Sequence, residues 1–260
     1  MRTEFRALTE TARTRADADQ MAMAQLRHSL VATLAKGRDL LDVACGSGYA
    51  LSLIAREARS VVACDRDEAN VRDARAAAPS ASVHVADAEN LRLEAASFDV
   101  VACLEAIYYF RDWRGFLADA HRLLREDGAL LVTWPNPSRP AFSRSQSSTV
   151  YPAVDEIVAA ATQLGFDATC YGGFPLQSLA TAGRPWVDAV RRTVVRLHLI
   201  PRSLRLRALI KRLLYRRLRP LSDVELMLDP FDHLTALAPG AAAPYAMLYL
   251  VAYKVPGATA

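Results

Sequence analysis

The stretch LLDVACGSGYA, Leu40–Ala50, decides the expected fold of this 260-residue chain. An apolar run that contains one acid, Asp42, leads into Gly46 and Gly48, which flank Ser47 ahead of a helix-like segment. Glycines let the backbone turn tightly and let a ligand approach where a Cβ would stand in the way. The free amide groups at the start of a helix attract an anionic or polar group. The stretch therefore predicts a strand, a ligand-binding glycine loop and a helix.

The residues on either side of this stretch repeat the order of strand and helix. Apolar runs at 39–45, 60–64, 82–86, 98–104 and 128–134 alternate with helix-like segments at 49–57, 68–77 and 113–125 and a short turn at 89–96. Strands that are continuous apolar runs indicate a parallel sheet covered by helices on both faces. After an amphipathic helix that ends near Gly165, strands at 167–174 and 245–254 complete the set. We expect a Rossmann-like α/β fold with a seven-stranded, mostly parallel sheet.

Three parts of the chain are expected. Residues 1–175 form the core, with one or two helices from Phe5 to about Leu34 leading into the first strand. Residues 176–240 form a helical insertion before the last strand, because periodicity there is helical between breaks at three prolines. Residues 241–260 supply the final core strand and a tail.

The insertion carries most of the positive charge. Residues 184–219 contain twelve Lys or Arg and one acid. The net positive charge of this segment is larger than the +4 of the whole chain, so the remaining residues together are negatively charged. Within it, SLRLRALIKRLLYRRLRP, residues 203–220, has leucine and isoleucine along one helix face. Such a helix fits a lid over the core or a contact with a membrane surface or lipid-like substrate, which we place at 202–219. RNA binding ranks third, since Tyr215 is the segment's one aromatic residue available for stacking on bases.

Nothing in the sequence indicates export or a membrane span. The first twenty residues mix both charge signs, with no apolar signal-peptide core. No window reaches the ~20 apolar residues that a spanning helix needs. The four cysteines are isolated from one another, which favours reduced thiols and a cytoplasmic protein.

Five pieces of the sequence, in order, resemble the class I S-adenosylmethionine-dependent methyltransferases. They are DVACGSG (42–48), VVACDRDEAN (61–70), VADAENL (85–91), FDVVACLEAIYYF (98–110) and FLADAHRLLREDGALLVTW (116–134). The resemblance covers residues 38–135, with weaker support to 175. A nicotinamide-binding loop would instead carry a third glycine, where this chain has Ala50 and Leu51.

The resemblance implies S-adenosylmethionine (AdoMet) as the cofactor. It places Asp65 on the ribose hydroxyls, Asp87 and Ala88 on the adenine, and Leu104 and Glu105 beside the sulfonium. The full set of expected cofactor-binding residues is Asp42, Ala44, Gly46, Gly48, Asp65, Arg66, Asp87, Ala88 and Leu104. Asp65 and Asp87 could instead cap the helices that follow them. Asp42 lies in an apolar strand and needs a partner, either a loop amide or the cofactor's ammonium group.

The catalytic candidates are Glu105, Tyr108 and Tyr109. Many relatives of this type carry Glu-His at the two tyrosine positions, so the histidine base is missing here. Positioning can supply much of the acceleration, and a tyrosine could orient the acceptor. We expect structural roles for His84 and His121. His28 is a weak catalytic candidate, on an N-terminal helix that in this family often covers the cofactor.

The expected activity is methyl transfer to a small molecule or a lipid- or sugar-linked intermediate. The alternatives are an RNA methyltransferase that holds RNA with the basic insertion, and a non-catalytic adaptor at a membrane or partner protein. No metal is expected, because the residues after the fifth strand, TWPNPSRP at 133–140, offer no acid cluster.

Overall fold

The computed structural model describes residues 10–139, 142–145, 147–176, 218–238 and 244–257. Most of the predicted insertion therefore lies outside the described residues, including its helix and most of the proposed membrane contact at 202–219. The division of the chain into three parts stays a prediction. Within the described residues, no helix is both long enough and apolar enough to cross a membrane.

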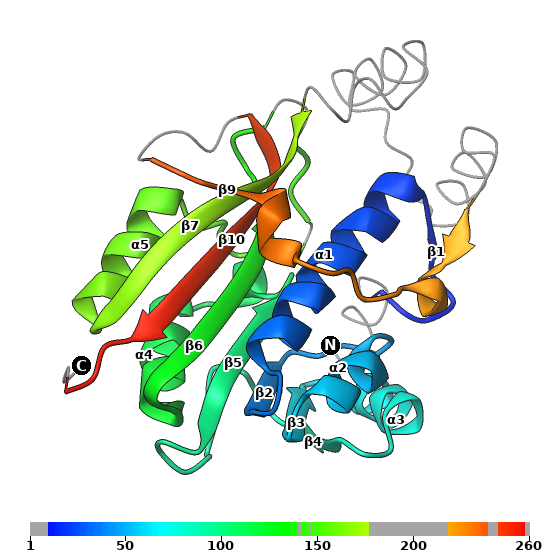
Figure 1. Ribbon diagram of the computed structural model, residues 1–260, viewed down its shortest axis with the longest axis horizontal. Coiled ribbons are helices and arrows are strands. Elements are labelled where there is room, and N and C mark those ends of the chain that lie inside the picture. Colours follow the sequence, from blue (N-terminus) through cyan, green and yellow to red (C-terminus); the bar gives the residue numbers. More distant parts are fainter. Residues whose placement is uncertain (1–9, 140–141, 146, 177–217, 239–243, 258–260) are drawn as a thin grey trace.

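An eight-stranded sheet forms the centre of the molecule (Figure 1). Its strands, in spatial order, are β4 (Ser82–Val85), β3 (Ser60–Asp65), β2 (Asp39–Val43), β5 (Phe98–Leu104), β6 (Leu124–Pro135), β10 (Tyr245–Lys254), β7 (Phe166–Pro175) and β9 (Leu234–Ala236). The first five are parallel, and the last three pairings are antiparallel. The seven predicted strands are confirmed, and β9 adds an eighth at the edge.

Helices cover both faces of this sheet (Figure 1). They are α1 (Ala18–Leu34), α2 (Leu51–Glu57), α3 (Glu68–Ala77), α4 (Trp113–Leu123) and α5 (Val154–Gln163). The first three share one apolar core with the sheet, and α4 and α5 share the other. Asp67 caps α3 by accepting from the amides of Ala69 and Asn70, and Asp112 caps α4. Local capping chemistry therefore sets where these helices begin.

The N-terminal segment differs from its prediction. Residues 10–17 are not helical, because Asp17 and Gln20 form a capping box that starts α1 at Ala18. Ahead of it, β1 (Arg15–Ala16) pairs with β8 (Arg219–Pro220), a strand from the far side of the insertion. Figure 1 shows these two short strands beside the start of α1.

The described end of the insertion also contains no α-helix. Residues 218–238 contain β8, the 3-10 turns η2 (Leu221–Asp223) and η3 (Pro230–His233), and β9. Pro220 and Pro230 explain the difference, since proline removes a helical hydrogen bond and clashes with the preceding turn. A smaller correction concerns Leu124 and Arg125, which begin β6 instead of ending α4.

The order of the strands fixes where a ligand binds. The chain runs outward from β2 through β3 to β4, then crosses back to place β5 on the other side of β2. Ligands in open α/β sheets bind at the carboxyl ends of the strands beside such a reversal. The loops after β2, β3, β4 and β5 therefore meet at one place.

Candidate functional site

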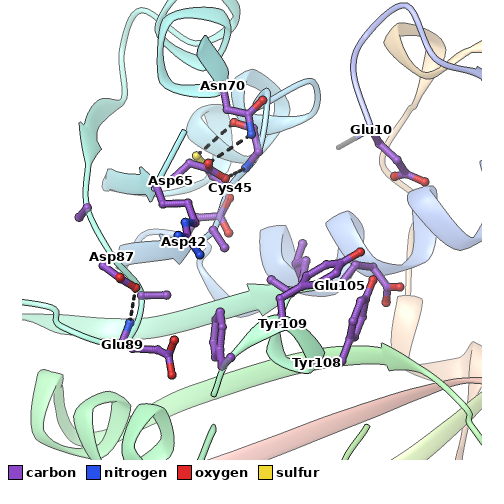
Figure 2. Close-up of a pocket in the computed structure, with 18 of the residues that line it drawn as sticks. Glu10, Asp42, Cys45, Asp65, Asn70, Asp87, Glu89, Glu105, Tyr108 and Tyr109 are labelled. Carbon is purple, nitrogen blue, oxygen red and sulfur yellow. Dashed lines mark hydrogen bonds between the residues drawn. The ribbon is translucent and has the colours of Figure 1, made fainter. Parts of the chain in front are cut away.

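A cavity opens at the carboxyl ends of these four strands (Figure 2). Figure 2 shows Asp65 and Asp87 on one side of it and Glu105 with the two tyrosines on the other. Its lining residues come from the N-terminal segment, α1, the four strand ends and the turn after β5: Glu10, Arg27, His28, Asp42, Ala44, Cys45, Gly46, Tyr49, Asp65, Arg66, Asn70, Ala86, Asp87, Ala88, Glu89, Leu104, Glu105, Ala106, Tyr108, Tyr109 and Phe110.

The glycine loop after β2 has backbone angles that favour glycine. Ala44, Gly46 and Gly48 have φ of 58°, 58° and 63°. A Cβ on Gly48 would lie 2.8 Å from the Ala74 Cβ and 2.9 Å from its Cα. Gly48 therefore lets α3 pack against the loop, and it does not line the cavity, whereas Gly46 does.

Asp65 holds the loop to the end of β3. Its Oδ2 accepts from the Gly46 amide at 3.0 Å, and its Oδ1 accepts from the Asp67 amide at 2.9 Å and the Asn70 side chain at 3.2 Å. The cap of α3 is Asp67, so helix capping does not explain Asp65. Asp87 accepts from the Glu89 amide at 3.1 Å within a turn, and no helix follows it. Both acids are left to face the cavity.

Asp42 is buried beneath this loop, with 6% of its surface exposed. Of the two expected partners, a loop amide is not found: among the residues that the structure describes, no donor reaches the Asp42 carboxylate. Burial raises the pKa of Asp42 to about 7, and the nearby Asp65 carboxylate adds to the increase. A buried carboxylate without a donor is costly when charged, so this position favours a cationic group from a ligand.

A buried arginine lies at the other side of the glycine loop. Arg27, on α1, forms an ion pair with Glu10 and donates at 2.7 Å to the Tyr49 hydroxyl. That hydroxyl in turn donates to Glu10 at 3.2 Å. Burial opposes the positive charge, but Glu10 and Tyr49 help to hold the pKa of Arg27 above its ordinary value. The arrangement is a site that binds a carboxylate, here the carboxylate of Glu10.

Glu105 lies at the end of β5 with a φ of 55°, a strained value for a residue with a side chain. Its Oε1 accepts from the Thr133 hydroxyl at 3.1 Å, and Thr133 is its one described hydrogen-bond donor. Burial raises the pKa of Glu105 to about 7, although Arg27 and the Thr133 hydrogen bond act in the opposite direction. Glu105 can therefore gain or lose a proton near neutral pH.

The turn after β5, η1 (Ile107–Tyr109), adds an aromatic wall. The Tyr108 ring stacks on Tyr151 with centroids 4.7 Å apart and touches the Tyr109 ring at 4.5 Å. The Tyr109 hydroxyl donates to Ser145 at 3.2 Å. Burial raises the pKa of both phenols, so both stay protonated and can donate to an oxygen or nitrogen atom in the cavity.

His28 also lines the cavity, next to Arg27 on α1. Its Nδ1 lies 2.7 Å from the Ala24 carbonyl oxygen, so this nitrogen carries the proton and donates. Burial and the Arg27 charge lower the pKa of His28 to about 3. The neutral ring packs edge-on against Tyr49 at 5.0 Å, a packing role rather than that of a base.

The remaining histidines have local partners. His121 is buried against Phe166, and His84 is exposed and bonds to Ser82.

Comparison with known proteins identifies the fold around this cavity. Residues 41–132 match the family described as the methyltransferase domain. The chain carries a class I S-adenosylmethionine-dependent methyltransferase domain. The family implies S-adenosylmethionine as the cofactor of this methyltransferase domain.

Relatives and solved structures agree with this assignment. A probable S-adenosylmethionine-dependent methyltransferase of Mycolicibacterium smegmatis is 38% identical over 116 residues, 45% of this chain and 44% of that protein. A ubiquinone biosynthesis O-methyltransferase of Caulobacter vibrioides is 31% identical over 121 residues, 45% and 48% of the two chains. The crystal structure of a SAM-dependent methyltransferase from Archaeoglobus fulgidus superposes with a TM-score of 0.60 at 13% identity, covering 90% and 94%. The chain spans about half the length of the curated relatives it matches.

The methyltransferase domain brings nearly all the sequence-predicted site residues to the cavity. Of the twelve, Gly48 is the exception, while Asp42, Ala44, Gly46, Asp65, Arg66, Asp87, Ala88, Leu104, Glu105, Tyr108 and Tyr109 line it. Their individual roles stay predictions.

The sequence did not indicate Glu10, Arg27 or Tyr49, which only the tertiary fold brings together. Asn70 was also missed, although its place after the Asp67 cap gave a signal that could have found it.

Proposed function

We propose that this chain transfers the methyl group of AdoMet to a small-molecule or a lipid- or sugar-linked acceptor. One observation carries the proposal: the unpaired Asp42 and the loop-bound Asp65 lie next to one another in the cavity, close enough for Asp65 to raise the pKa of Asp42. A cofactor with an ammonium group and vicinal ribose hydroxyls satisfies both acids.

The cavity residues suit the separate parts of AdoMet. Asp65 can accept from both ribose hydroxyls, and Asp87 can accept from the adenine amino group. Asp42 suits the ammonium group, and Arg27 suits the carboxylate at the methionine end. When bound, the cofactor supplies a methyl group that its sulfonium activates toward attack. Leu104 and Glu105, at the end of β5, then border the side of the cavity that an acceptor would enter.

The aromatic wall supports an acceptor that is at least partly apolar. Tyr108, Tyr109 and Phe110 give the cavity flat apolar surfaces, and the two phenols add hydrogen-bond donors. Among the residues that the structure describes, six acids and two arginines line the cavity, which disfavours a strongly anionic acceptor group beside the reacting atoms. A relative that acts in ubiquinone biosynthesis is consistent with this class.

For methyl transfer the protein has to position the acceptor and remove its proton. With AdoMet bound, an acceptor atom held in line would take the methyl group, and the electron pair of the broken carbon–sulfur bond would stay on sulfur. Glu105 is placed to receive the proton that an acceptor hydroxyl or amine loses. The tyrosines orient the acceptor.

Incubation with methyl-labelled AdoMet and fractionated cell extract tests the proposal. We expect label in the lipid, carbohydrate or small-metabolite fraction, and label in RNA would favour the RNA alternative instead. Calorimetry with AdoMet and S-adenosylhomocysteine is the companion measurement. Absence of binding together with absence of label would refute methyl transfer and leave a non-catalytic adaptor.

A further inference from the structure

Glu10 places a carboxylate inside the cavity from outside the sheet. Figure 2 shows it across the cavity from Asp65, next to α1. Its carboxylate bonds to Arg27 and Tyr49, and its backbone oxygen accepts from the Ser47 hydroxyl at 2.9 Å. Ser47 is only 5% exposed. Both the side chain and the backbone of Glu10 therefore contact the glycine-loop side of the cofactor site.

The partner of Glu10 is one of two cationic side chains that line the cavity in the described part of the chain. Among the described lining residues, Arg27 and Arg66 carry positive charge, and Arg66 directly follows the ribose-side Asp65. A ligand that puts its adenosine part near Asp65 and Asp87 puts its amino-acid part toward Arg27. The carboxylate of that part has the same charge and geometry as the carboxylate of Glu10.

We propose that Glu10 occupies the carboxylate subsite of the cofactor pocket, so that AdoMet binds by displacing Glu10 from Arg27 and Tyr49. The inference rests on the proposed function, because it takes AdoMet as the ligand. The guanidinium and the phenol then exchange one carboxylate for another, and Arg27 is never left buried and unpaired. Glu10 is an autoinhibitory contact that lowers the affinity for any ligand with this carboxylate.

The segment that carries Glu10 is fastened to the described C-terminal end of the insertion. Leu221 donates its amide to the Thr14 oxygen at 3.0 Å, and Ser222 donates to the Ala12 oxygen at 3.1 Å. Leu221 itself is buried against α1 and the start of α2. This attachment keeps the Glu10 carboxylate near Arg27 after displacement, which gives it a high effective concentration as a competitor.

Calorimetry on the full chain with the variant Glu10→Gln tests the competition. Glutamine keeps the size of the side chain and one acceptor oxygen, and it removes the charge that pairs with Arg27. We expect AdoMet to bind about tenfold more tightly, the gain that follows when the open site rises from about a tenth of the molecules to most of them. Glu225→Gln is the matched control, because Glu225 is exposed, follows Leu221 and Ser222 in the chain, and does not line the cavity. It makes the same change in net charge and should leave the affinity unchanged.

A second ligand separates competition from a general electrostatic effect. Methylthioadenosine keeps the adenosine part and lacks the carboxylate, so its affinity should be equal in the wild type and Glu10→Gln. Equal tightening for both ligands, or for both variants, would overturn the proposal. Weaker AdoMet binding by Glu10→Gln would also overturn it, because Glu10 would then be a cofactor ligand. If no variant binds either ligand, the proposed function fails; if wild type and Glu10→Gln bind AdoMet equally, only this inference fails.

Discussion

The amide of Gly46 donates a 3.0 Å hydrogen bond to the carboxylate of Asp65, which ties the glycine loop after β2 to the end of β3. The two residues come from two separate sequence motifs, and each is needed to place the other. The same carboxylate takes two further donors, from Asp67 and Asn70, so its position is fixed before any ligand arrives. A preorganised acceptor of this kind loses little conformational freedom on binding.

Replacing Asp65 with alanine should weaken AdoMet binding by about 10- to 100-fold, the range expected for losing hydrogen bonds to a charged group. Part of the loss comes from the ribose hydroxyls and part from release of the Gly46 amide. Calorimetry measures the affinity, and circular dichroism shows whether the variant is folded. Asp167→Ala, at the exposed start of β7, is the control. Wild-type affinity in a folded Asp65→Ala variant would exclude the ribose role.

The second prediction separates backbone strain from close packing at two glycines with similar φ. Gly37 and Gly48 have φ of 67° and 63°, but a Cβ on Gly37 has nothing within 4 Å. Gly37→Ala should lower the free energy of unfolding by about 1 kcal/mol through strain alone. Gly48→Ala should cost about 2–4 kcal/mol, because the new Cβ also collides with the Ala74 backbone. Urea denaturation of both variants measures the difference, and equal losses would show that the contact with α3 is not tight.

A third prediction concerns stability and pH at Asp42. Its pKa is about 7 in the folded protein and near 4 when unfolded, so between these values the folded state keeps a proton that the unfolded state has lost. The free energy of unfolding therefore falls as pH rises through this window and stays lowered above it. Asp42→Asn has no charge to bury, so it should be more stable than the wild type by about 1–3 kcal/mol at pH 8 and nearly equal to it at pH 4.5.

Urea denaturation at the two pH values checks this, with Asp167→Asn as the exposed control. The same Asp42→Asn variant should bind AdoMet more weakly, because the ammonium group loses its carboxylate. A gain in stability with a loss of affinity is the signature of a residue kept for binding. A variant that is less stable than the wild type at pH 8 would show instead that Asp42 has a structural partner.

The sequence predicted the strands because their apolar runs are local features. The resemblance of these runs to the methyltransferase motifs placed Asp42, Asp65, Asp87 and Glu105 around one ligand, and parallel strands do end together at one edge of the sheet. The N-terminal segment could not be predicted in the same way. Its alanine- and leucine-rich composition favours helix, but the capping box at Asp17 starts the helix late, and pairing with Arg219–Pro220 makes the preceding residues extended.

The side of the cavity that α1 forms also could not be predicted from local sequence patterns. Arg27 is one of many arginines in the chain, and neither its spacing nor its neighbours distinguish it. Its importance comes from burial beside Tyr49 and from the carboxylate of Glu10, contacts that depend on the packing of three segments. Gly48 differs in another way: the motif predicts ligand contact, and the structure adds a close packing contact with Ala74 that the motif did not indicate.

The last prediction tests Glu105 as the proton acceptor. Its pKa of about 7 means that the rate of methyl transfer should rise with pH and level off above about 8, as the carboxylate forms. The charged groups that act on the Glu105 carboxyl are Arg27 and Arg139, which lower its pKa, and Glu10, which raises it. Glu105→Gln should lower kcat by about 10²- to 10⁴-fold and remove the rise, with little change in AdoMet affinity.

Thr133→Val supplies the matched variant for this test. Thr133 is fully buried and its hydroxyl donates at 3.1 Å to Oε1 of Glu105, a bond that lowers the pKa of this carboxyl. Valine has nearly the same shape, so the midpoint of the pH profile should move to higher pH while the plateau rate is largely kept. A structural role for Glu105 would reduce the plateau in both variants and leave the midpoint in place. The pKa of an acid that only supports the fold does not set the midpoint of the pH–rate profile. A higher midpoint in Thr133→Val, together with the loss of the pH-dependent rise in Glu105→Gln, therefore identifies Glu105 as the proton acceptor.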